Sequence, residues 1–172
     1  QKSDGMLEII QKNALKLNKQ KNNPIEKKFV QAKSLERAGL YEEALLLFKE
    51  INQEQPGKRK YFQSMKNYLK QTEAWDTLYV YTQSYANARN QDFQSQLEFI
   101  DLYIWKNESL KWKQIVSKLM KTQHKNENSI KVIIQILVNN GQLDFAYERL
   151  MNYRQDKGPR DFYSMEMATY FG

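Results

Sequence analysis

A period of about 34 residues recurs along this chain, and it constrains the fold more than any other feature of the sequence. A glycine, an apolar residue, an alanine and a second apolar residue stand in one fixed pattern at Gly39, Tyr41, Ala44 and Phe48. The same pattern returns three periods later, at Gly141, Leu143, Ala146 and Leu150. Ala168 follows Ala32 by four such periods. Recurrence of this kind predicts an array of stacked supersecondary units.

The clearest unit spans residues 23–57 and contains two helices. Asn23 can cap a helix that has Pro24 in its first position, where proline loses no hydrogen bond. This helix is expected to end near Gly39. Apolar residues spaced by three and four then predict a second helix that begins at Tyr41 and ends before Pro56.

This unit resembles the tetratricopeptide repeat, through Ala32, Gly39, Tyr41, Ala44, Phe48 and Pro56. In that family small residues stand where two antiparallel helices touch, aromatic residues lie beside them, and a proline closes the repeat. The resemblance therefore implies that Ala32 and Ala44 allow the two helices to approach each other closely, while Tyr41 and Phe48 fill the space around these alanines. It extends in degenerate form over about residues 23–171, although Lys28 and Ile51 depart from the family pattern.

The middle units are weaker copies. Trp75 lies one period after Tyr41 and is expected to open a helix with Leu78 on its buried face. Trp112, with Ile115, is expected to open the next one. Because the step from Trp75 to Trp112 is longer than one period by three, we expect a longer turn at 107–111. The preceding helices are expected at 61–70, 93–105 and 130–138.

The predicted fold class is all-α, a right-handed superhelix of about four helix pairs with an extra helix at each end. It forms a single domain over residues 1–172, in which 1–22 is the N-terminal helix and 159–172 is a cap or the first helix of a further repeat. The four repeats are expected at 23–57, 58–91, 92–125 and 126–158. Because each repeat needs a neighbour, we expect the array to continue beyond residue 172.

The residues that catalysis and cofactor binding require are scarce. The chain has no cysteine, and His124 is its only histidine, in a polar turn where it is expected to be solvated. No histidine, cysteine or carboxylate cluster suggests a metal site, and the isolated glycines form no phosphate-binding loop. Glu42 and Glu43 suit a helix start, where carboxylates are favoured by the helix dipole. We therefore predict a protein that is not an enzyme and needs no cofactor.

Charge is distributed in alternating bands along the chain, which carries a net +7. Residues 1–33, 58–71 and 106–125 each have a net charge of +5, whereas 34–57 and 72–105 carry −3 and −4. Such banding favours solvated helix faces over a dedicated anion site. No apolar run reaches the roughly 20 residues that a membrane span requires.

The resemblance also implies where a partner binds, because the first helices of tetratricopeptide repeats line a concave groove. The groove positions in this chain are occupied by Lys33, Arg37, Lys60, Gln63, Asn67 and Lys70. A basic groove prefers acidic or carboxylate-bearing segments. Binding of chaperone tails is not predicted, since Phe29 stands where the family's clamp has a cation. The expected function is a protein-binding scaffold, part of a larger multi-repeat protein or assembly.

Two other functions stay open. Basic and aromatic residues alternate between Lys58 and Lys70, as on helical repeats that bind single-stranded RNA. However, Phe62 and Leu69 fit a buried stripe, and acidic bands interrupt the basic ones. The second alternative is a structural spacer or an oligomerisation segment. Because the sequence begins at Gln1 rather than at methionine, we expect that something preceded it, and we favour an exported or periplasmic protein over a cytoplasmic one.

Overall fold

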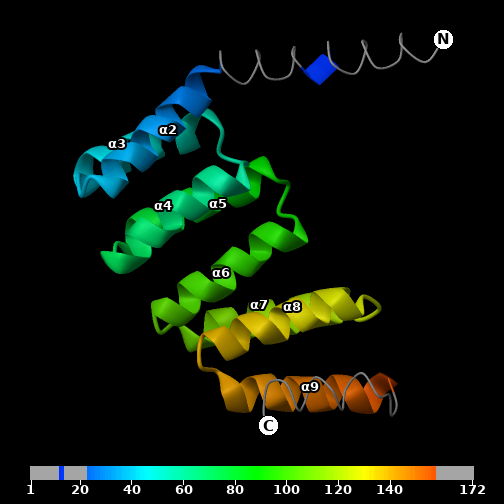
Figure 1. Cartoon of the computed structure of the whole chain (residues 1–172). Helices are drawn as coiled ribbons and strands as arrows, with labels where there is room; N and C mark the ends of the chain where they lie inside the picture. The colour runs from blue at the N-terminus through cyan, green and yellow to red at the C-terminus, as the bar shows by residue number, and fades with distance from the viewer. Residues whose placement is uncertain (1–11, 14–22, 158–172) are drawn as a thin grey trace, which may run out of the picture. The chain divides into compact units, whose positions relative to one another are not determined.

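The computed structural model describes residues 12–13 and 23–157, and it is helical throughout these ranges without a β-strand (Figure 1). Within residues 23–157, eight helices form four consecutive pairs. The first helices of the pairs are α2 (Pro24–Arg37), α4 (Arg59–Gln71), α6 (Phe93–Trp105) and α8 (Glu127–Asn139). The second helices are α3 (Tyr41–Glu54), α5 (Trp75–Ala88), α7 (Ser109–Thr122) and α9 (Leu143–Lys157). The all-α fold of packed helix pairs is therefore confirmed. The expected terminal helices and Ala168 lie outside the described residues, apart from the helical residues 12–13.

The turn inside each pair repeats its backbone conformation with the period of the sequence. One residue in each turn has a positive φ, namely Gly39, Glu73, Asn107 and Gly141, with values from 53° to 79°. The amide of the following residue donates to the carbonyl five residues earlier, as in Leu40 to Leu35 and Gln142 to Leu137. This bond satisfies a carbonyl that the end of the helix leaves without an intrahelical donor. The period is thus present in all four units, including those with little sequence likeness.

Buried positions follow the same period. The register of Ala44 continues through Leu78, Trp112 and Ala146, and all four side chains are at most 3% exposed. The register of Phe48 continues through Thr82, Val116 and Leu150, which are equally buried. Residues of different size and type therefore occupy equivalent buried positions, which explains why the repeat is hard to see in the middle of the chain.

The expected longer turn before Trp112 is wrong. Helix α7 begins at Ser109, one period after Trp75, the first residue of α5. Trp112 is the fourth residue of its helix and matches the buried Leu78, whereas Trp75 opens its helix and is only partly buried. The two tryptophans are not equivalent, so the longer step between them needs no extra residues in the turn.

Two expected packing residues are more exposed than their roles suggest. Tyr41 is 52% exposed and Leu143 is 47% exposed, both as first residues of a second helix. A side chain at a helix end has neighbours on fewer sides than one in the middle. Tyr41 contacts the ring of Tyr68 at a centroid distance of 6.3 Å instead of filling the space between α2 and α3. Ile115 is partly buried against the core.

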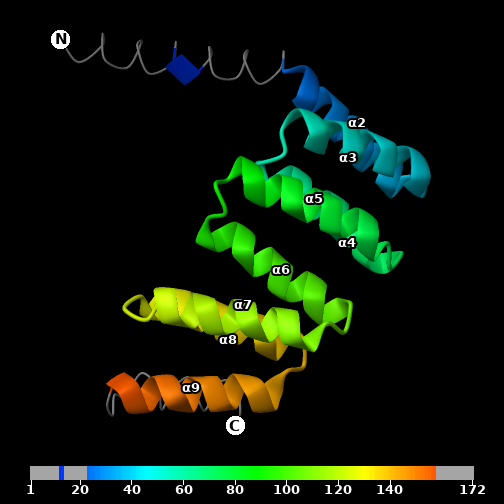
Figure 2. The ribbon, with the colours of Figure 1, turned by 180° about the vertical axis from the view of Figure 1, so that it is seen from behind.

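The chain divides into two compact units, residues 1–88 and 89–172. In the first unit α2 packs on α3, α3 on α4 and α4 on α5. Phe62 stacks on Tyr85 in its core at 4.4 Å between ring centroids. In the second unit α6 packs on α7 and α8, and α8 packs on α9 (Figure 2). Its core is built by Ile100, Trp112, Val116, Ile134 and Leu150.

Candidate binding face on helices α2 and α4

The six predicted partner-binding side chains lie in two helical stripes of the first unit. Lys33 and Arg37 are four positions apart on α2, so they share one face of that helix. The spacings of three and four on α4 likewise place its four residues on one face: Lys60, Gln63, Asn67 and Lys70. We call these two stripes together the α2/α4 face.

An ion pair joins the two stripes where both helices begin. The two carboxylate oxygens of Glu26 on α2 each accept a bond of 2.8 Å from Nζ of Lys60 on α4. The Tyr61 hydroxyl donates to the same carboxylate over 3.0 Å. Glu26 and Lys60 are one period apart and therefore occupy the same register in neighbouring repeats. The two helices thus lie side by side at this end.

Aromatic rings support this ion pair. Nζ of Lys60 lies 4.8 Å from the ring centroid of Phe29 and 5.2 Å from that of Tyr61. The rings of Phe29 and Tyr61 are themselves 5.1 Å apart. A cation this close to aromatic faces gains attraction from their quadrupoles. Lys60 is therefore held in one position, although about half of its side chain is exposed.

The cluster shifts two ionisations. The hydrogen bond from Lys60 holds the pKa of Glu26 below its usual value, against the opposing effect of partial burial. Burial raises the pKa of the Tyr61 hydroxyl to about 12, and its bond to the Glu26 carboxylate adds to the increase. Glu26 is therefore ionised and Tyr61 protonated at neutral pH, so the cluster combines one cation, one anion and a neutral phenol.

The other predicted side chains differ in their surroundings. Lys33 forms an ion pair with Glu36 on its own helix, and its Nζ lies 5.9 Å from the ring of Phe48. Gln63 is half-buried, whereas Arg37, Asn67 and Lys70 are exposed. Counting Glu26 and Glu36 with the four cations, the face carries a formal net charge of +2. It is basic, but less so than its cations alone imply.

Sequence reasoning missed Glu26 and Tyr61 as members of this face. The signal was present, because residues one period apart on parallel first helices face each other. Glu26 and Lys60 have opposite charges at that spacing. Tyr61 carries no comparable signal, since its role follows from the packing of α4 on α2.

No group of three or more histidine, cysteine, aspartate or glutamate side chains able to hold a metal ion occurs within residues 12–13 and 23–157. His124 lies in the turn between α7 and α8, as expected, and its side chain is 41% exposed. Its Nε2 is 3.7 Å from a carboxylate oxygen of Asp156. In the described part of the chain, each helix is too short or too polar to cross a membrane.

The fold and the α2/α4 face define an all-α protein built from packed helix pairs that repeat with one constant period. Comparisons with family models, with curated proteins and with solved structures gave no match.

Proposed function

We propose that this chain is a tetratricopeptide-like scaffold that binds an extended, acidic segment of a partner protein along the α2/α4 face. One observation carries the proposal. The face bears more cations than carboxylates, and Arg37, Asn67 and Lys70 are exposed on it. Its net positive charge favours a partner segment with aspartate or glutamate residues.

The polar residues of α4 suit an extended peptide. Gln63 and Asn67 each carry an amide that both donates and accepts, and so matches the N–H and C=O groups of a peptide backbone. Arg37 and Lys70 stand in the last turns of α2 and α4, where the helix dipole places partial negative charge. That dipole weakens the attraction for a carboxylate, so we expect moderate, salt-dependent affinity.

Burial of the aromatic residues argues against nucleic-acid binding here. Single-stranded nucleic acids are held chiefly by base stacking on exposed aromatic rings. Tyr61 is 5% exposed and Phe62 is fully buried, so neither ring face is available to a base. Tyr68 is half-buried, so the segment between Lys58 and Lys70 offers at most one partly exposed ring of its own for stacking.

Fluorescence anisotropy with two labelled dodecapeptides tests the proposal. One peptide alternates glutamate and serine, and the other has glutamine in place of glutamate. We expect the full chain to bind the glutamate peptide more tightly, and to lose most of this preference when salt rises from about 50 to 300 mM. Equal binding of both peptides, or of neither, would contradict the proposal.

The double variant R37E/K70E locates the site. It should lower affinity for the glutamate peptide by at least about tenfold, since two attractive charges become repulsive. The matched control is K49E/K118E on α3 and α7, which changes the net charge by the same amount outside the α2/α4 face. If the control weakens binding as much as the double variant, attraction is a property of net charge and not of this face. Preferential binding of a mixed-sequence oligonucleotide with a steep salt dependence would favour the nucleic-acid alternative.

A further inference from the structure

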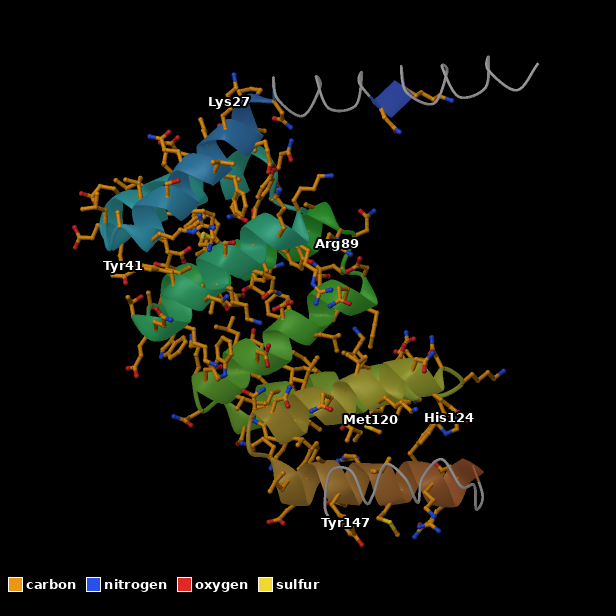
Figure 3. The ribbon with its side chains drawn as sticks, in the orientation of Figure 1. Lys27, Tyr41, Arg89, Met120, His124 and Tyr147 are labelled. Atoms are coloured by element: carbon orange, nitrogen blue, oxygen red, sulfur yellow. The ribbon has the colours of Figure 1, made fainter. Side chains whose placement is uncertain are left out.

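A cavity of about 230 Å³ lies between helices α7 and α9 of the second unit, whereas the α2/α4 face belongs to the first. Among the described residues, its lining consists of Ser117, Met120, Lys121, His124, Arg149, Asn152, Tyr153 and Asp156. The side chains of Met120 and His124 extend toward α9 in Figure 3. This volume is smaller than that of typical pockets for whole small-molecule ligands, so the cavity suits a single side chain or terminal residue.

Arg149 is the most informative residue of this cavity. Its guanidinium carbon lies 4.6 Å from the ring centroid of Phe145, which also has Nζ of Lys113 at 5.5 Å. The Nε atom of Arg149 is buried, and no protein atom within the described residues accepts its hydrogen. A buried N–H group without an acceptor is destabilising. The Arg149 side chain, which lines the cavity, therefore gains stability from a ligand that brings an acceptor to its guanidinium group.

The surrounding charges select an anion as that ligand. Lys121 stands in the same cavity, and no ion pair within the described residues joins it or Arg149 to a carboxylate. Among the lining residues that the structure describes, Asp156 is the one carboxylate, and its side chain is 68% exposed and lies near His124. A guanidinium edge next to an ammonium group matches the planar, two-oxygen geometry of a carboxylate.

Tyr153 and Met120 form the apolar part of the cavity wall, beside the polar Ser117 and Asn152. Tyr153 is 3% exposed, packs edge-on against His124 at 5.3 Å, and donates its hydroxyl to the His124 carbonyl over 3.0 Å. This hydrogen bond connects the turn after α7 to α9 and so fixes the distance between the two sides of the cavity. Met120, whose side chain adapts to different shapes, completes the apolar part.

We propose that this cavity binds one carboxylate-bearing residue of a partner polypeptide, with its apolar part against Met120 and Tyr153. Arg149 and Lys121 receive the carboxylate through the guanidinium and ammonium groups. The site belongs to a different unit from the α2/α4 face and does not depend on the function proposed there. Part of the basic band at residues 106–125 thus has a specific binding role and is not only a solvated helix face.

Two small probes test the site in the full chain. N-acetylphenylalanine carries a free carboxylate, and N-acetylphenylalaninamide is its neutral analogue. We expect N-acetylphenylalanine to shift the Arg149 Nε–H and Met120 methyl resonances saturably in the millimolar range, and the amide to leave both nearly unchanged. Absence of a saturable shift, or equal shifts with both probes, would refute the proposal. If inorganic phosphate competes equally well, the cavity binds any anion and the assignment to a carboxylate residue fails.

Three variants assign the interaction to residues. Arg149→Gln should weaken binding of N-acetylphenylalanine by at least about tenfold, and Lys121→Gln by less. Asp156→Asn should strengthen it about twofold, because the nearby negative charge is removed, and this gain cannot arise from misfolding. The matched control is Arg154→Gln, which removes a positive charge from α9 outside the cavity. If Arg154→Gln has the same effect as Arg149→Gln, or if Asp156→Asn weakens binding, the proposal is wrong.

Discussion

At the scale of single residues, the turn within each helix pair depends on one position with a positive φ. Glycine adopts this conformation without cost, whereas other residues lose about 1 kcal/mol or more there. Two of the four turns contain glycine, and the other two contain Glu73, with φ 53°, and Asn107, with φ 58°. The fold therefore imposes the conformation even where the residue type does not favour it.

Replacement of Glu73 by glycine should stabilise the protein by about 1 kcal/mol, because it removes this strain. Asn107→Gly should gain less, since asparagine tolerates the left-handed region. Gly39→Ala should cost about 1 kcal/mol through strain alone, because an added Cβ would meet no atom within 4 Å. Urea unfolding measures all three. A loss of stability in Glu73→Gly would show that the glutamate side chain matters more than its backbone conformation.

Ionisation of Tyr61 provides a second residue-scale prediction. Its pKa of about 12 lies above the ordinary value of 10, so the folded state binds more protons than the unfolded state between these pH values. Stability should therefore decrease as pH rises from about 10 to 12. In Glu26→Gln the carboxylate is gone but burial remains, so the pKa of Tyr61 should decrease without returning to its ordinary value. Selective ¹³C labelling of tyrosine followed by NMR titration measures the shift, and an unchanged pKa would rule out a contribution from Glu26.

At the scale of helices, the N-terminal caps differ at equivalent positions. Asp92 and Asn126 accept hydrogen bonds from the amides of Ser95 and Ser129, at 2.8 and 3.1 Å. Lys58 stands one period before Asp92 and has a similarly extended backbone, but no side-chain bond caps α4. Its positive charge also opposes the helix dipole. Helix α4, which carries most of the proposed binding residues, therefore begins with a weak cap.

Lys58→Asp should stabilise the protein by about 1 kcal/mol relative to Lys58→Ala, because aspartate can accept the bond that lysine cannot. The alanine variant removes the positive charge without adding a cap and so separates the two effects. Asn126→Ala should lower stability by about 1 kcal/mol at the equivalent site of α8. Thermal unfolding monitored by circular dichroism measures all three variants. Equal stability of the aspartate and alanine variants would show that α4 gains nothing from a cap.

At the scale of the whole molecule, contacts gather within residues 1–88 and within residues 89–172. In such arrays stability is approximately the sum of local terms and interactions between neighbouring repeats. A substitution that creates a cavity in one unit should therefore lower the stability of that unit more than that of the other.

Phe62→Ala tests this expectation. Phe62 is fully buried and stacks on Tyr85, so its truncation should cost about 3–5 kcal/mol. Amide hydrogen exchange should show the largest loss of protection in α2 to α5 and a smaller loss in α6 to α9. Ile134→Ala in the second unit should give the reverse pattern. Uniform loss of protection in both variants would mean that the two units unfold together.

The limits of α2, α3 and α6 and the turns that contain glycine could be predicted from the sequence alone, because they depend on interactions between residues that are close along the chain. Asn23, Pro24, Gly39 and Gly141 act within one helical turn of their own positions. The starts of α3, α5 and α9 followed from the period of the sequence. The start of α7 did not follow in this way. Trp112 shares its residue type with Trp75 but its position in the repeat with Leu78.

Only the tertiary structure decided which side chains meet. The hydrogen bond of Tyr61 to Glu26, the exposure of Tyr41 and the position of Asp156 near His124 all depend on neighbours from other helices. Packing between helices determines the axial position and rotation of each helix relative to the next, and local sequence patterns encode these only indirectly. The sequence thus determined a repeating helical frame, whereas tertiary packing determined the charge of its α2/α4 face and created the cavity between α7 and α9.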